Sequence, residues 1–220
     1  MVEKVALSLS RRPLAYELGK WVLRDTFEGN VNFKTQISGY WADMGRCCAH
    51  SRDGTYVFRI FMFNPVGDEQ YARAYRPLPI WKEEILYAYA IPTVTGDMSA
   101  PYFEIILRPG LSTDYVWGVR FGVFGGDWKY LASDGTWKTG SFTFPALNSG
   151  ETAHLGLVVS PSHGTYVALY VRGTRYDIHT LEAPTGVTII DEPNYFSYGV
   201  YSKSANSVFV DIDEVGVAVL

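Results

Sequence analysis

Aromatic side chains beside turns are the residues of this sequence that suggest chemistry most directly. The stretch 124–140, FGGDWKYLASDGTWKTG, carries two tryptophans and a tyrosine among turn residues. An exposed flat ring can stack on the C–H face of a sugar, and tryptophan and tyrosine also bring a polar group to the contact. The candidate carbohydrate-binding residues, including two tryptophans beside other loops, are Trp41, Trp81, Trp128, Tyr130 and Trp137.

The same stretch also has an interpretation without a ligand. A turn at residues 133–135 predicts a hairpin in which Trp128 and Trp137 pack across the two strands. Such cross-strand aromatic pairs contribute about 0.2–1 kcal/mol to a sheet. The sheet face that each ring occupies decides between the two interpretations.

Carboxylates that could hydrolyse a glycoside are not paired in an obvious way. A retaining mechanism needs two carboxyl groups about 5–5.5 Å apart, and alternate residues of one strand can supply them. Glu104 stands alone in its strand, whereas Asp211 and Asp213 share a face but lie in the closing strand. The four histidines belong to no recognisable Ser/His/Asp or Cys/His arrangement. The sequence therefore favours a protein that is not an enzyme.

Strands must position these residues, because strand patterns recur along almost the whole chain. Runs rich in Val, Ile, Tyr, Phe and Thr alternate with clusters of Gly, Pro, Asp and Ser, which is typical of a sandwich or barrel. Segment 68–75 fits a short helix or an edge strand. The expected strands are 20–27, 55–63, 84–92, 101–109, 114–124, 140–144, 153–160, 165–173, 195–203 and 207–220.

Composition indicates one globular domain with an N-terminal arm. Of 220 residues, 47% are hydrophobic and the formal charge is −4, so residues 20–220 can form a single core. Residues 1–19 are more polar and are expected to pack on their own sheet or on a neighbouring subunit.

Basic residues are scattered, which disfavours nucleic acid, and no apolar run is long enough to span a membrane. Scarce glutamine and asparagine suggest heat adaptation, and the adjacent cysteines 47 and 48 predict no disulfide.

The N-terminus does not resemble a signal peptide, because charged residues interrupt it. We therefore expect synthesis in the cytoplasm, and a location on a virion or particle, or at the cell surface by a non-classical route, stays open.

Three motifs resemble the concanavalin A-like jelly rolls, a superfamily that includes lectins, glucanases and laminin G-like domains. VLRDTFEGN (22–30) resembles their opening strand, VFVDIDEVGV (208–217) their closing strand, and segment 155–178 one of their hairpins. The resemblance implies an all-β, two-sheet antiparallel β-sandwich in which the first and last strands pair. It does not name the activity, because many functions share this fold. The Glu-x-Asp-x-x-Glu motif of the laminarinase-type glucanases and the signatures of the alginate lyases are missing.

The resemblance also implies a structural calcium ion where the first and last strands meet. Calcium takes six to eight oxygen ligands at about 2.3–2.6 Å. Part of this shell could come from Glu28, Gly29, Asp211 and Asp213. Alternatively, these carboxylates face water or pair with Arg24.

Three functions follow from these expectations. The first is a non-catalytic, lectin-like protein that binds a glycan. The second is a structural, self-assembling subunit of a virion surface or filament, a homo-oligomer that uses residues 1–19 for its contacts. The third is a glycan-degrading enzyme.

Overall fold

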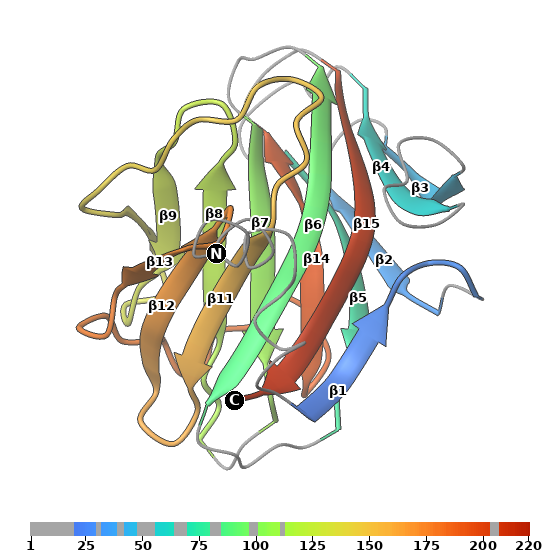
Figure 1. Ribbon diagram of the computed structural model, residues 1–220. Coiled ribbons are helices and arrows are strands. Elements are labelled where there is room, and N and C mark those ends of the chain that lie inside the picture. Colours follow the sequence, from blue (N-terminus) through green and yellow to red (C-terminus); the bar gives the residue numbers. More distant parts are fainter. Residues whose placement is uncertain are drawn as a thin grey trace, which may run out of the picture.

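The computed structural model (Figure 1) describes residues 20–29, 32–38, 42–47, 56–63, 70–79, 85–96, 101–110, 113–202 and 207–220. These residues form two antiparallel sheets packed face to face, and none of them is helical. The predicted all-β sandwich is therefore confirmed. Helices that could cross a membrane are absent from the described ranges, and the proposed arm, residues 1–19, lies outside them.

Sheet A is the layer nearest the viewer in Figure 1. Its strands, in spatial order, are β13 (Thr174–Asp177), β12 (Thr165–Val171), β11 (Leu155–Ser160), β6 (Leu86–Gly96), β15 (Val208–Val219), β4 (Val57–Met62) and β3 (Ala42–Cys47), with β1 (Lys20–Asp25) beside β15.

Sheet B is the second layer. Its strands, in spatial order, are β10 (Trp137–Thr139), β9 (Trp128–Leu131), β8 (Trp117–Gly122), β7 (Pro101–Arg108), β14 (Tyr195–Ser202), β5 (Gln70–Pro77) and β2 (Lys34–Ser38).

The two ends of the chain meet in sheet A. Strand β1 pairs with the last part of β15, where Leu23 lies opposite Val217 and Asp25 opposite Val215. The first part of β15 pairs with β4 instead. This confirms the expected pairing of the opening and closing strands, and the predicted hairpin in segment 155–178 forms as β11 and β12.

Strand alternation places the core between the sheets. On β7, Phe103, Ile105 and Leu107 point inward and belong to the main hydrophobic cluster, so the residues between them point to the outer face of sheet B. Trp117 is fully buried in the same cluster. The outer face of sheet B is therefore built from the alternate residues of these strands.

Three local expectations were wrong or incomplete. Residues 140–144 form no strand, because Phe144 makes only a loop hydrogen bond to Gly126. The described part of segment 68–75, from Gln70 on, belongs to β5, which is not at an edge since β2 pairs with its outer side. Trp128 and Trp137 are not cross-strand partners, because Trp137 lies opposite Leu131. The turn itself forms as expected, with Gly135 at φ +77°.

Candidate functional site

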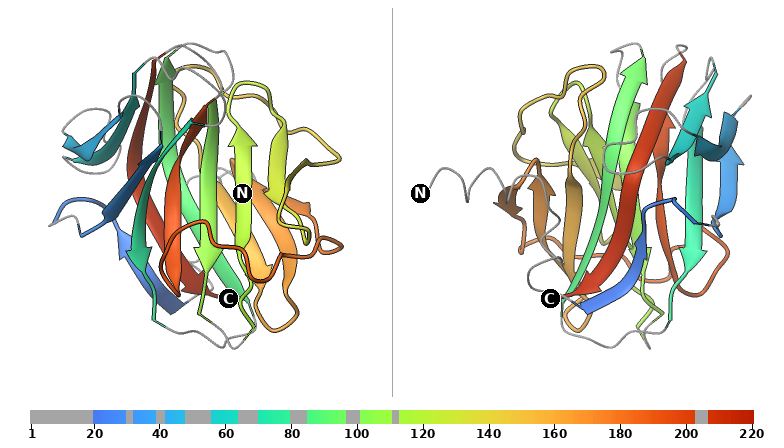
Figure 2. Two further views of the ribbon diagram at one scale, coloured as in Figure 1. Left: turned by 180° about the vertical axis from the view of Figure 1, so that it is seen from behind. Right: turned by 45° about the vertical axis from the view of Figure 1, so that its right-hand side comes forward.

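A row of polar side chains crosses the outer face of sheet B. The register aligns the following residues from β2 to β10: Gln36, Arg73, Gly199, Glu104, Arg120, Lys129 and Thr139. The left view of Figure 2 shows this face of the sheet toward the viewer. Residues at equivalent positions on neighbouring strands lie about 4.8 Å apart, so the side chains form one line across the sheet, interrupted at Gly199.

Two arginines hold one buried carboxylate at the centre of the row. Arg73 donates hydrogen bonds to both carboxylate oxygens of Glu104, and Arg120 Nε donates to Glu104 Oε2 at 2.9 Å. All three residues are at most 4% exposed. Burial by itself would raise the pKa of Glu104, but the two arginines attract and hydrogen-bond its charged form and hold the pKa below its usual range. Glu104 therefore stays ionised at neutral pH and cannot serve as a general acid.

Gly199 is the residue that allows this contact. It lies on β14, between Arg73 on β5 and Glu104 on β7, so the arginine must pass over it. A Cβ on Gly199 would lie 3.0 Å from Arg73 Cγ and 2.4 Å from the Ala72 carbonyl oxygen. A larger residue here would push the arginine away from the carboxylate.

Aromatic rings lie directly against the two arginines. The Arg120 guanidinium lies 3.8 Å from the centre of the Trp137 ring and 3.6 Å from that of Tyr201. The Arg73 guanidinium lies 3.8 Å from the centre of the Tyr71 ring. Such cation–π contacts fix ring and cation relative to each other. Tyr201 is buried, whereas Tyr71 and Trp137 are half-exposed.

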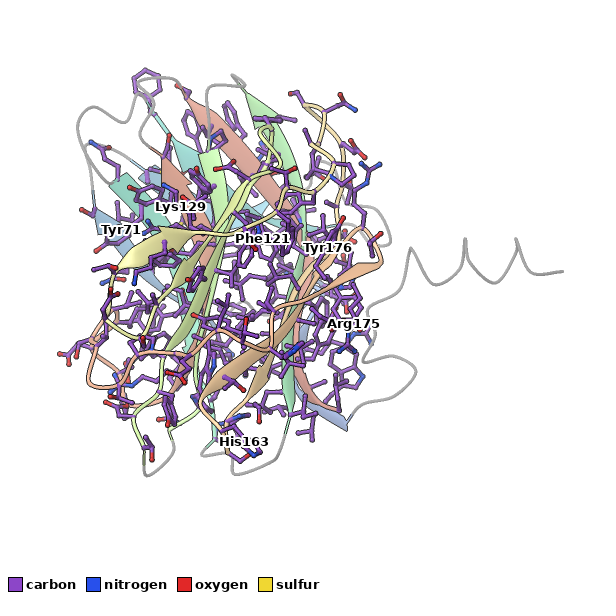
Figure 3. The ribbon with its side chains drawn as sticks, turned by 90° about the vertical axis from the view of Figure 1, so that its left-hand side faces the viewer. Tyr71, Phe121, Lys129, His163, Arg175 and Tyr176 are labelled. Atoms are coloured by element: carbon purple, nitrogen blue, oxygen red, sulfur yellow. The ribbon has the colours of Figure 1, made fainter. Side chains whose placement is uncertain are left out.

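A second group of side chains borders the row at the loop between β8 and β9. The Tyr102 hydroxyl donates to Asp127 Oδ2 at 2.5 Å, and Lys129 Nζ lies 5.0 Å from the centre of the Tyr102 ring. Asp127 fills the space above Gly122, where a Cβ would meet its Oδ1 at 2.0 Å. Burial and the neighbouring carboxylate raise the pKa of Tyr102, which stays protonated. Figure 3 shows Lys129 and Tyr71 on the outer side of sheet B.

The residues that lead into β14, including 187–190, cover the part of this outer face that lies beside the row, and Figure 2 shows them crossing the sheet. Val187, Ile189 and Ile190 pack with Ile106 and Tyr195 in a separate hydrophobic cluster. The amide of Gln36 donates to the Ile189 carbonyl at 3.2 Å. The segment thus closes one side of the face and leaves the row with its half-exposed rings as the accessible part.

The structure separates the predicted sugar-binding residues. Trp137 lies half-exposed on the outer face of sheet B, and Tyr130 is half-buried between the sheets. Trp128 is 1% exposed in the core, so its ring face is covered. Trp41 and Trp81 lie outside the described residues. Only Trp137 of the described candidates contributes to the outer face, and sugar binding by any of them stays a prediction.

The residues proposed for calcium have protein partners. Both oxygens of Asp211 accept hydrogen bonds from Arg59, at 2.6 and 2.7 Å. A side-chain oxygen of Glu28 accepts from the backbone of Tyr56, and the carbonyl of Gly29 accepts from Arg46. Asp213 is buried within β15, the strand that also holds Asp211.

Within the described ranges, no three side chains of the metal-binding types gather in one place. Arg24, the suggested alternative partner, pairs with Glu214. The calcium site stays a prediction.

The remaining residues of the face gave little signal in the sequence. Arg73, Arg120 and Tyr71 sit in ordinary strand patterns, and Arg73 and Arg120 are 31 and 16 residues from the glutamate that they share. A possible sign was Gly199 within the aromatic run YFSYGVYS, because glycine in a strand interior often marks a close approach of another group.

Comparison with solved structures identifies the fold. No protein-family model matches the chain, and no curated protein sequence matches it. The endo-β-1,4-glucuronan lyase from the fungus Trichoderma reesei matches over 91% of this chain and 96% of its own, with a TM-score of 0.62 at 11% identity. The cellulose-induced protein Cip1 matches over 90% and 97%, with a TM-score of 0.58 at 13% identity.

A third structure, a conserved carbohydrate esterase from the Shiga toxin-encoding bacteriophage phi24B, matches over 92% of this chain and 99% of its own. Its TM-score is 0.56 at 11% identity. At these identities the likeness shows the fold, and activity must be argued from the site. The chain has the concanavalin A-like jelly-roll fold.

Proposed function

We propose that the protein binds a polysaccharide on the outer face of sheet B. The observation that carries this proposal is the set of half-exposed rings of Tyr71, Tyr102 and Trp137, two of which rest on the buried Arg73–Glu104–Arg120 network. Rings that are fixed before binding lose little conformational freedom when a sugar stacks on them. The carbohydrate-related names of structures with the same fold support the proposal.

The charges of this face favour a polysaccharide that carries carboxylates. Within the row and its border, three cations, Arg73, Arg120 and Lys129, oppose two carboxylates, Glu104 and Asp127, which gives a net charge of +1 (3 − 2). The Lys34–Glu192 and Arg108–Asp114 pairs nearby add no net charge. The whole chain has a formal charge of −4, so the face is locally positive on an acidic protein. Lys129 is the half-exposed cation of the row and can meet an acidic sugar directly. A neighbour named for glucuronan supports the same class.

Binding to glucuronan and to a neutral β-glucan, measured by calorimetry, tests the proposal. Trp137→Ala should weaken glucuronan binding about fivefold, because a stacked ring contributes on the order of 1 kcal/mol. Lys129→Ala should weaken glucuronan binding but not binding to the neutral polymer. The matched control is Lys138→Ala, since Lys138 is a neighbouring lysine that pairs with Asp134 instead. The proposal would be contradicted if the protein bound neither polymer. It would also be contradicted if Lys138→Ala lost as much glucuronan affinity as Lys129→Ala.

A glycan-degrading enzyme is the second candidate, and the Tyr102–Asp127 pair is the observation that favours it. The protonated Tyr102 hydroxyl beside a carboxylate is a potential proton donor at the rim of the row. Glu104 is unsuited to a two-carboxylate hydrolysis, because both arginines hold it ionised. Release of new chain ends from glucuronan, lost in Tyr102→Phe, would support the enzyme. The structural-subunit alternative depends on residues 1–19 and stays a prediction.

A further inference from the structure

A separate cavity opens at the edge of the sandwich, between the last strands of the two sheets. It has a volume of about 160 Å³ and lies between β9, the residues after β10, and the end of β13. Strands β10 and β13 are the terminal strands of sheets B and A at this edge. Figure 3 views the molecule from this edge, with Tyr176 of β13 labelled.

Aromatic side chains form the inner wall of the cavity. Trp128, Tyr130 and Phe142 all line it, and the centre of the Phe142 ring lies 4.9 Å from that of Trp128. Phe142 stacks on Tyr176 with the ring centres 5.0 Å apart and the planes at 9°. Because these rings support one another, the wall is formed before any ligand arrives.

A buried donor without an acceptor lies in this wall. The Nε1–H of Trp128 has no hydrogen-bond partner in the described structure, although Trp128 is 1% exposed. Its indole edge packs against Gly140, which also lines the cavity. A Cβ at position 140 would lie 2.3 Å from Nε1. Buried donors nearly always have partners, but this atom has less than 1 Å² of accessible surface, so an acceptor in the cavity reaches it when the segment at Gly140 shifts.

The mouth of the cavity is polar. Asp177, Thr139 and Thr180 are exposed and line it together with the rings. Carboxylate and hydroxyl groups at the mouth and flat rings at the base suit a molecule with hydroxyl groups around its edge and C–H groups on its face. A sugar ring has this distribution of polar and apolar groups.

The size of the cavity limits the ligand to one ring. Sites for drug-sized ligands span roughly 300–1,000 Å³, about two to six times this volume. If it is filled by solvent, the cavity holds about five water molecules at roughly 30 Å³ each. The occupant is therefore a single small molecule or the end of a chain, and not a segment of polymer.

We propose that this cavity is a second carbohydrate site that binds one pyranose ring, with Phe142 and Tyr130 contacting the sugar face and with Trp128 Nε1–H donating to a ring or hydroxyl oxygen once the segment at Gly140 shifts. The site is distinct from the outer face of sheet B and does not depend on it. Trp137 and Lys129 do not line it.

Nuclear magnetic resonance of the indole N–H groups tests this inference. The six tryptophans give separate indole signals, and Trp128→Phe identifies that of Trp128 by its loss. Titration with glucose, galactose and glucuronate should shift the Trp128 signal of the wild-type protein and saturate at millimolar concentrations. The Trp137 signal reports on the outer face in the same experiment, so failure of one site is distinguishable from failure of the other.

A blocking variant separates binding in the cavity from general effects. Thr180→Phe places a ring at the exposed mouth and should weaken the sugar affinity at least about tenfold. Ser133→Phe is the matched control, because Ser133 is exposed in the β9–β10 turn and does not line the cavity. Ser141→Phe, at another exposed position of the mouth, replaces Thr180→Phe if that variant does not fold.

Two results would overturn the inference. One is a Trp128 signal that does not move with any of the three sugars, or that moves equally in the blocking variant. The other is a shift with cyclohexanol but with none of the sugars, which would show an apolar cavity without sugar recognition.

Discussion

Neutralising Glu104 should destabilise the protein far more than breaking an ion pair on its surface. Glu104→Gln keeps the shape of the side chain but leaves Arg73 and Arg120 as two buried cations without an anion. Both arginine side chains are at most 5% exposed. Breaking a buried ion pair by removing one partner costs about 3–5 kcal/mol.

The rings on the arginines hold the two guanidinium groups in place when Glu104 is replaced. Contacts with Tyr71, Trp137 and Tyr201 remain in the variant and stabilise the cations by about 0.5–2 kcal/mol each. They are present in both proteins, so they do not offset the loss directly, but they keep the guanidinium groups in place. A glutamine oxygen can then accept one of the former hydrogen bonds, and we expect a loss of about 3–4 kcal/mol, toward the lower end.

Urea unfolding at neutral pH measures this loss. The midpoint should fall while the slope of the free energy against urea stays constant, and the melting temperature should fall by roughly 6–16 °C for a chain of this size. Arg175→Gln is the surface control, because its pair with Asp177 is about half exposed, and it should cost less than about 1 kcal/mol. A loss below about 1 kcal/mol in Glu104→Gln would refute the role given to this network.

The remaining predictions concern pH and metal. Glu104 has a lowered pKa in the folded protein, so its stabilisation is complete above its unfolded pKa of about 4.3 and is lost as the pH falls through the folded value. The difference in unfolding free energy between wild type and Glu104→Gln should therefore be constant above about pH 5 and shrink below about pH 4. A constant difference down to the most acidic pH studied would disprove this. If calcium binds near Asp211, then EDTA should lower the melting temperature and added calcium restore it, and no change with either would rule the ion out.

The fold could be predicted from the sequence because strand alternation and turn residues recur along the whole chain. The opening motif at 22–30 and the closing motif at 208–217 were informative together, since β1 and β15 pair as the resemblance implied. The predicted strand at 140–144 failed for a physical reason. Its phenylalanines pack inward from a loop, and burial of apolar residues alone does not require a partner strand.

The outer face was not predictable, because its members are distant in sequence and individually ordinary. Arg73, Glu104 and Arg120 come from three strands, and they form a network only when β14 lies between β5 and β7. A glutamate alone in an apolar strand had no visible partner in the sequence. The pairing register, which a single sequence does not reveal, supplies both arginines.

The length of the turn between β9 and β10 decides which face of sheet B Trp128 and Trp137 occupy. Lys129 lies opposite Thr139 and Leu131 opposite Trp137, so residues 132–136 form the connection. Partners across a hairpin share a face, and neighbours along a strand alternate. Trp137 therefore shares the outer face with Leu131, whereas Trp128 points inward.

A connection one residue longer or shorter would reverse the faces of β10 relative to β9, because a one-residue slip in register moves every side chain to the other side. Trp137 would then leave Arg120, and the outer face would lose its half-exposed tryptophan ring. Gly140 would also move from the indole of Trp128, against which it fits only without a side chain. Both proposed sugar sites thus depend on the same register, and inserting one residue at Gly135 should impair binding at both if β9 and β10 still pair.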